Sequence, residues 1–249
     1  MPDLSPALLA AVIATFFAAG IVKGVTGMGL PTLSMGILGA LFSPLTAASL
    51  LIVPSFVTNA WQLLAGPSLT PLVRRLWQMM VAIAAGTVLG TAWLASGDSR
   101  MTTVALGVAL VAYSTYTLLA RQLTVPARCE AWLSPVTGTV TGLISGVTGV
   151  FVIPSVPYLQ ALGLAKDDLV QALGLSFTVS TVALAIGLVA HGSFRLDNIA
   201  LSAFAVLPAL AGMWAGQIMR ARISAVAFRR GFLICLLLLG SEMCLRPLY

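Results

Sequence analysis

Long apolar segments that hold almost no charge run the whole length of this chain, and they constrain its fold more than any other feature. A helix of about 20 residues crosses the hydrocarbon core of a membrane, and most of the segments approach that length. Two of them, 30–42 and 150–163, are clearly shorter. The ten segments are 5–26, 30–42, 45–65, 76–95, 101–120, 133–149, 150–163, 169–190, 197–218 and 229–245. The sequence therefore predicts an all-α polytopic membrane protein.

Composition excludes a soluble domain. Hydrophobic residues make up 59% of the 249 positions and charged residues 8%, whereas soluble domains carry about 25% charged residues. The pI of about 9.8 would suit a nucleic-acid-binding protein, but the 13 basic residues are scattered between apolar segments. We therefore expect a lipid bilayer as the surrounding medium and no nucleic-acid partner.

The basic residues also predict an orientation. If the loop with Arg74 and Arg75 is cytoplasmic, strict alternation of the segments places 9 basic residues inside and 3 outside. This bias follows the positive-inside rule, and it predicts that both termini lie on the outer side of the membrane. No basic residue precedes the first segment and no cleavage site follows it, so we expect a retained span rather than a signal peptide.

The two halves of the chain resemble each other. Residues 20–27 read GIVKGVTG and residues 142–149 read GLISGVTG, with an offset of 122 at every identical position. A Gly-x-x-x-Gly pair at 86–90 has a counterpart at 212–216. Small residues at helix contacts could produce such matches by chance, but the shared GVTG favours duplication.

This repeat predicts the organisation of the chain. Residues 1–120 form a first transmembrane repeat, 121–132 a cytoplasmic linker and 133–249 a second repeat. Each half contains five segments, an odd number, so the two repeats should have opposite orientations in the membrane. Inverted repeats of this kind recur in secondary transporters, which bind their substrate where the repeats meet.

Each copy of GVTG interrupts a helix, and these two breaks are the leading candidates for a binding site. An early proline follows each break, and proline is favoured in the first turn of a helix, so we expect short helices to begin near Gly29 and Val150. Helix starts present free N–H groups and a positive dipole end, which together favour anions. Tight packing turns without a ligand are the alternative. The candidate binding residues are Thr26, Gly27, Met28, Gly29, Thr148, Gly149, Val150 and Phe151.

Lys23 is the one charge clearly inside an apolar segment, one turn before the first break. A charge at membrane depth is costly and indicates function by default, and an ammonium could neutralise a bound anion. The alternative is that the long side chain reaches the interface. Ser145 occupies the equivalent place in the second half, so we include it in the site although the halves differ chemically there.

Polar residues on the third segment are further candidates. Asn59 and Gln62 share a helix face with Ser55, and they either line a pathway or form hydrogen bonds between helices. Groups for other chemistry are missing: the seven carboxylates lie in expected loops or at segment ends, and the three cysteines fit no metal motif. We expect no catalytic residues, metal or cofactor.

The paired breaks followed by proline, VTGMGLP and VTGVFVIP, resemble the TauE/SafE family of sulfite and organosulfonate exporters. Residues 172–177 (ALGLSF), the later Gly-x-x-x-Gly pair and the basic stretch 220–230 extend the resemblance over nearly the whole chain. The resemblance implies an anion permease for small sulfur-containing anions such as sulfite or sulfoacetate.

We expect a secondary transporter, an exporter by this resemblance, that holds an oxyanion between the two breaks and alternates its access to the two sides. An anion-selective channel is the first alternative. An intramembrane enzyme built on Ser145 is the second, but the chain's single histidine, His191, falls in a loop, and no buried base is available to activate a serine. The expected partner is a small anion. The oligomeric state stays open, with a homodimer among the options.

Overall fold

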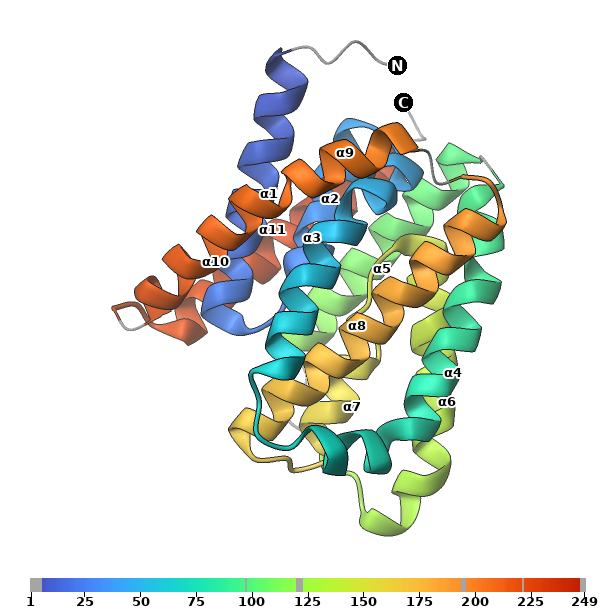
Figure 1. Ribbon diagram of the computed structural model, residues 1–249, viewed down its shortest axis with the longest axis vertical. Helices are drawn as coiled ribbons and strands as arrows, with labels where there is room; N and C mark the ends of the chain where they lie inside the picture. The colour runs from blue at the N-terminus through green and yellow to red at the C-terminus, as the bar shows by residue number, and fades with distance from the viewer. Residues whose placement is uncertain (1–5, 97, 120–122, 194–195, 221, 247–249) are drawn as a thin grey trace.

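All regular structure in the described part of this protein is α-helical (Figure 1). The computed structural model describes residues 6–96, 98–119, 123–193, 196–220 and 222–246. The helices are α1 (Pro6–Thr26), α2 (Leu30–Leu41), α3 (Pro44–Leu64), α4 (Leu69–Ala95), α5 (Ser99–Leu119), α6 (Ala127–Thr148), α7 (Ser155–Ala161), α8 (Lys166–Ala190), α9 (Leu196–Phe204), α10 (Val206–Arg220) and α11 (Ala225–Leu245). The all-α fold class is confirmed.

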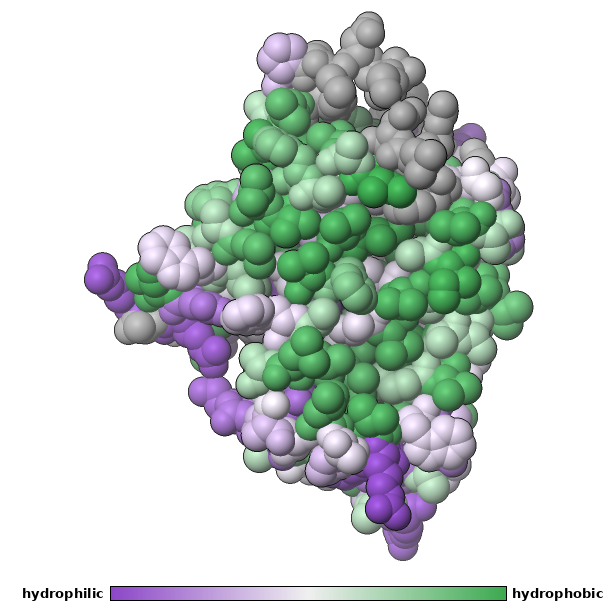
Figure 2. Space-filling model, viewed as in Figure 1, coloured by the Kyte–Doolittle hydropathy of each residue, from purple (hydrophilic) through white to green (hydrophobic). Residues whose placement is uncertain are grey.

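Six helical stretches among the described residues are long and apolar enough to cross a membrane. They are Leu9–Thr26, Pro44–Leu64, Leu69–Ala95, Ser99–Leu119, Lys166–Ala190 and Ile199–Arg220. Apolar side chains also cover much of the outer surface over α3, α8 and α10, and hydrophilic side chains gather at the left edge and at the lower end of the molecule (Figure 2). An apolar exterior of this extent is suited to lipid, so the chain is a multi-pass membrane protein.

Two predicted segments differ in how their helices are divided or where they begin after a break. The segment 197–218 is observed as α9 and α10, which meet at Ala205. Pro208 accounts for the interruption, because its ring crowds the carbonyl of the residue four positions earlier, Phe204, and it has no N–H to donate. The start predicted near Val150 is wrong, since α7 begins at Ser155. The residue before a proline avoids the helical conformation, and Pro154 thus delays this helix.

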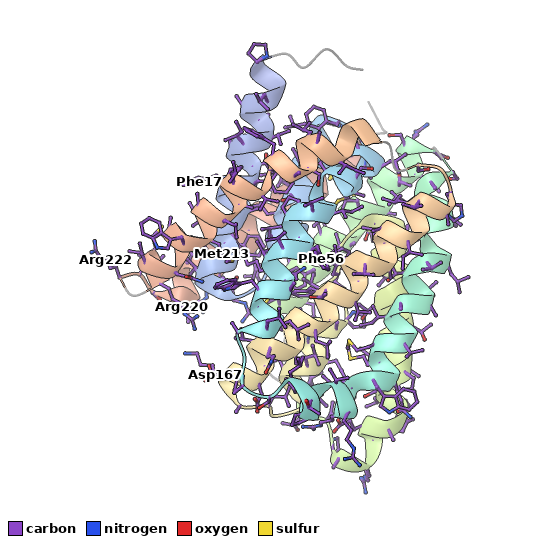
Figure 3. All side chains as sticks on the ribbon, in the orientation of Figure 1. Phe17, Phe56, Asp167, Met213, Arg220 and Arg222 are labelled. Carbon is purple, nitrogen blue, oxygen red and sulfur yellow. The ribbon has the colours of Figure 1, made fainter. Side chains whose placement is uncertain are left out.

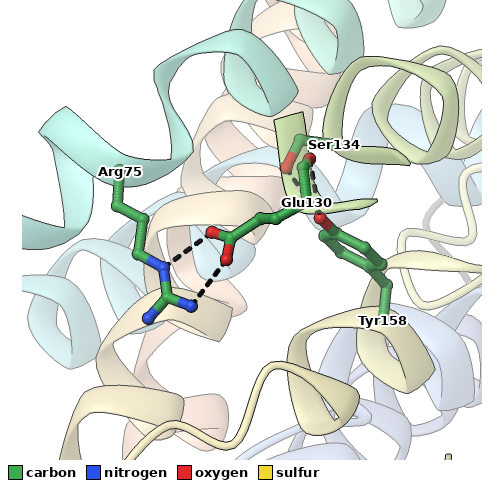
Figure 4. Close-up of polar contacts among 4 residues, drawn as sticks. All are labelled: Arg75, Glu130, Ser134 and Tyr158. Carbon is green, nitrogen blue, oxygen red and sulfur yellow. Dashed lines mark hydrogen bonds and ion pairs between the residues drawn. The ribbon is translucent and has the colours of Figure 1, made fainter. Parts of the chain in front are cut away.

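Helices α4 and α6 begin earlier than predicted, and an ion pair joins the second turn of α4 to the first turn of α6 (Figure 4). Arg75 donates from Nε to Glu130 Oε1 at 2.6 Å and from a terminal nitrogen to Oε2 at 2.7 Å. The hydroxyls of Ser134 and Tyr158 lie 2.7 Å apart beside this pair. Helix α6 thus starts inside the range 121–132 predicted as a linker, of which 121 and 122 lie outside the described residues.

The closest helix contacts join the two halves of the sequence. Helix α4 packs along α6, and α1 packs along α10. A Cβ added to Gly24 would lie 2.2 Å from the Met213 carbonyl oxygen, and one added to Gly146 would lie 2.3 Å from the Thr87 carbonyl oxygen. Both pairs of helices therefore touch backbone to backbone, as the Gly-x-x-x-Gly pairs predict. The inverted repeat itself stays a prediction.

Candidate functional site

The first break is a tight turn built by glycine and one threonine. Helix α1 ends at Thr26, and Gly27 and Gly29 then adopt φ angles of 78° and 100°, which glycine reaches without steric cost. The Thr26 hydroxyl lies 2.8 Å from the carbonyl oxygen of Val22 and accepts the Met28 N–H at 3.3 Å. Helix α2 starts at Leu30, where it was predicted.

One turn before this break, Lys23 points into the protein. Its side chain is only 3% exposed, and its ammonium donates to the side-chain oxygen of Asn59 on α3. The Asn59 amide group in turn donates to Ser55 Oγ at 3.1 Å and to Thr181 Oγ1, on α8, at 3.4 Å. These four side chains form a buried polar cluster, and the described side chain that bonds Lys23, Asn59, is neutral.

The electrostatics of this cluster favour an anion. Neither of the ion pairs Arg75–Glu130 and Arg246–Glu242 includes Lys23, and no described carboxylate pairs with it. A buried charge without a counter-ion is costly, and in a membrane-spanning helix it indicates a functional site. A negatively charged ligand beside Lys23 would compensate that charge.

A cavity of about 290 Å³ gives such a ligand room, close to the lower end of the range of about 300–1,000 Å³ found for small-molecule pockets. Lys23, Gly24 and Gly27 form its α1 wall. Arg220, on α10, and Asp167, at the start of α8, lie on two sides of its mouth, with Met213 further along α10 (Figure 3). The remaining lining residues are Trp61, Gln62, Ala65, Gly66, Pro67, Val170, Gln171 and Gln217.

Two glutamines hold the walls of the cavity together. Gln62, on α3, donates to the Val170 carbonyl oxygen at 2.8 Å. Gln171, on α8, donates to the Leu63 carbonyl oxygen at 2.7 Å and accepts the Ser68 N–H at 2.7 Å. These bonds satisfy backbone groups at the end of α3 and fix α3 against α8, so the cavity has a defined shape.

The second break repeats the turn but lies in other surroundings. Gly149 has a φ of 69°, and the Thr148 hydroxyl donates to the Ile144 carbonyl oxygen at 2.6 Å and accepts the Val150 N–H at 3.2 Å. Val150 and Phe151 are fully buried. Ser145 donates to the Val150 carbonyl oxygen at 3.3 Å. None of these residues lines the cavity at the first break.

The structure thus separates the predicted site residues into two groups. The cavity is lined by Lys23, Gly27 and Gln62, and Asn59 bonds the Lys23 ammonium. The adjoining turn is built by Thr26, Met28 and Gly29. The residues of the second break are buried elsewhere, and their role in binding stays a prediction.

Sequence reasoning missed several residues at the site. Thr181 lies 122 positions after Asn59, the same offset that separates the two GVTG motifs, so the repeat could have singled it out. Gln171 falls at the start of an apolar helix, where a single amide carries little signal. Arg220 counted only toward the topology and the family resemblance, although it lines the cavity.

Apolar spans, closely packed helices and a buried lysine beside a polar cavity are expected of a membrane transport protein, and the comparisons give its family. A family model for the sulfite exporter TauE/SafE matches residues 12–243. No curated protein and no solved structure matches the chain. The chain belongs to the sulfite exporter TauE/SafE family.

Proposed function

We propose that this protein is a carrier, an exporter in its cellular role, of small sulfur-containing anions such as sulfite or organosulfonates. The anion binds in the cavity beside the first break, with its negative head on the Lys23 ammonium. The observation that carries the proposal is the burial of Lys23 beside the neutral Asn59, with no described carboxylate in an ion pair with it. The family supplies the class of substrate.

The polar walls of the cavity suit the remaining parts of such a ligand. Gln217 and Gln62 border the same space as Lys23, and amide groups can both donate and accept hydrogen bonds. Arg220 at the mouth attracts anions from the water, and a basic cleft with low-dielectric walls raises their local concentration. Asp167 on the other side of the mouth disfavours ligands with a second negative group at that point.

Alternating access fits the way in which helices of the two sequence halves pack against each other. Each close helix pair, α1 with α10 and α4 with α6, takes one helix from each half. If the halves are inverted repeats, as the offset of 122 supports, rocking of one pair against the other would open the cavity to each side in turn.

The proposed orientation places the cavity mouth toward the cytoplasm of a cell inner membrane. The first two turns of α4, α6 and α8 lie at one end of the molecule (Figure 1), and they carry Arg74, Arg75, Arg128 and Lys166. Positive residues favour the cytoplasmic face. Arg121 and Arg195, which enter the charge count, lie outside the described residues.

Anion binding to the detergent-purified protein tests the proposal. Sulfite in oxygen-free buffer, sulfoacetate, taurine and sulfate would be titrated by calorimetry against the protein, Lys23→Met and Lys166→Met. We expect one sulfur anion to bind. Lys23→Met should lower the affinity for that anion roughly 10- to 100-fold, since a charge-assisted hydrogen bond contributes about 1.5–3 kcal/mol. Lys166 is exposed outside the cavity, so Lys166→Met should bind like the unchanged protein. No binding by any of the four anions would overturn the substrate class.

Asn59→Asp separates an anion site from a structural lysine. The new carboxylate would pair with Lys23 and compete with the ligand, so the affinity for the anion should fall at least about tenfold while the melting temperature stays the same or rises. Unchanged affinity in Asn59→Asp would show that the anion binds away from Lys23. Uptake into proteoliposomes, compared with single-channel currents, then distinguishes a carrier from a channel.

A further inference from the structure

A second polar hollow lies on another side of α8. It has a volume of about 390 Å³ and is bordered by Thr117 of α5, Gln160 of α7 and Arg229 of α11. Leu169 borders this hollow, whereas its neighbour Val170 borders the cavity at the first break. Consecutive helix residues point in different directions, so the two spaces open on different faces of α8.

Arg229 gives the hollow a net positive charge. It is the one charged side chain among the described residues that border this hollow, and it interacts electrostatically with the Tyr113 hydroxyl. Neither of the ion pairs Arg75–Glu130 and Arg246–Glu242 includes it. A half-buried guanidinium with neutral neighbours is suited to bind a phosphate or carboxylate, for which its fork of donors is well shaped.

An apolar groove adjoins the hollow. The groove has a volume of about 480 Å³, and its walls include Ala112, Tyr113, Leu133 and Ile153. Tyr116, Leu123 and Pro157 border both spaces, so one leads into the other. Tyr116 and Leu123 are 41% and 61% exposed, which leaves the groove open to the medium around the helices.

The combination has the shape and polarity of a lipid. We propose that an anionic phospholipid such as phosphatidylglycerol occupies this site, with its phosphate on Arg229 and Gln160 and one acyl chain in the apolar groove. Basic pockets between membrane helices on the cytoplasmic side bind anionic headgroups, and the hollow lies beside the first turn of α8, at the basic end of the molecule. A water-soluble anion would make no use of the adjoining groove.

Native mass spectrometry of the whole protein tests the site. The protein, freed of its own lipid, would be mixed with phosphatidylglycerol or phosphatidylcholine of identical acyl chains. We expect phosphatidylglycerol to be retained at least about fivefold more, and Arg229→Gln to abolish the difference, because a neutral side chain loses the charge-assisted bonds to phosphate. Arg230→Gln is the matched control, since Arg230 is exposed and does not border the hollow.

The groove has its own test. Ala112 is exposed and borders the groove, so Ala112→Trp should block the acyl chain and lower retention without disturbing the core. Val108→Trp, one turn earlier on the same exposed face of α5, is the control for added bulk. Equal loss in Arg229→Gln and Arg230→Gln would show nonspecific attraction and overturn the site. Binding of soluble glycerol phosphate that Ala112→Trp leaves unchanged would overturn the lipid assignment.

Discussion

The two helix breaks share a turn but differ in what surrounds it. In each, a glycine with positive φ follows a threonine whose hydroxyl bonds the carbonyl four residues back and accepts an N–H two residues on. Four residues before that glycine stands Lys23 in the first break and Ser145 in the second. The lysine reaches across to Asn59 beside a cavity, whereas the serine bonds to its own turn. One residue thus changes a structural turn into a candidate anion site.

The segments that follow the breaks also diverge for a local reason. Gly29 adopts a φ of 100° and allows α2 to begin at once. Phe151 stands at the corresponding place in the second half, 122 positions later, and a side chain there rarely adopts a positive φ. Together with Pro154, Phe151 therefore keeps the chain out of a helix until Ser155, and α7 has only 7 residues where α2 has 12. In the second half, therefore, no helix begins directly at the break.

The largest expected effect comes from making the first break like the second. Lys23→Ser should weaken sulfite binding roughly 10- to 100-fold, because it removes the charge that compensates the anion. Ser145→Ala should change the affinity less than about twofold, since it removes only a weak 3.3 Å bond within the second turn. Isothermal titration of both variants measures the difference.

A comparable loss in both variants would break the comparison. It would mean that the anion contacts both breaks at once, which is the arrangement that the sequence predicts. Thermal unfolding of each variant is the control, because a poorly folded protein would lose binding for an unrelated reason.

Sequence reasoning succeeded where the signal is local and failed where it depends on packing. The first break and the bounds of α3 follow from glycine, proline and apolar length, and α3 differs from its prediction by one residue at each end. Lys23 and Asn59 were both identified, but their contact joins residues 36 positions apart on different helices. Only the crossing of α1 and α3 brings them together, and no local pattern encodes that crossing. The role of Pro208 in dividing α9 from α10 was a local signal that went unused.

A smaller effect tests whether the two interlocked helix pairs are equivalent. Gly24→Ala and Gly146→Ala should each lower the free energy of unfolding by about 1–3 kcal/mol, because each added Cβ meets a backbone carbonyl oxygen within 2.3 Å and the helices must separate. Gly231→Ala, which meets nothing within 4 Å in α11, should leave stability unchanged or raise it by up to about 1 kcal/mol. Thermal unfolding in detergent gives the three values. A neutral Gly24→Ala beside a harmful Gly146→Ala would contradict the equivalence on which the repeat proposal depends.

The smallest expected effect comes from the two threonines of the breaks, and it tests whether their hydroxyls stabilise the turn or also support ligand binding. Thr26→Val and Thr148→Val should each reduce the free energy of unfolding by about 1 kcal/mol, since each removes the hydroxyl that satisfies backbone groups of its break. Thr139→Val is the control, because the Thr139 hydroxyl makes the same bond to a carbonyl four residues back on an exposed face of α6.

Titration of the same threonine variants with sulfite gives the decisive difference. The turn at the first break borders the cavity through Gly27, so Thr26→Val should lower the affinity for the anion a few-fold by shifting Lys23. Thr148→Val should leave the affinity unchanged, because its turn is buried outside that cavity. If Thr148→Val weakens binding as much as Thr26→Val does, the second break takes part in binding, and the difference between Lys23 and Ser145 cannot by itself define the site.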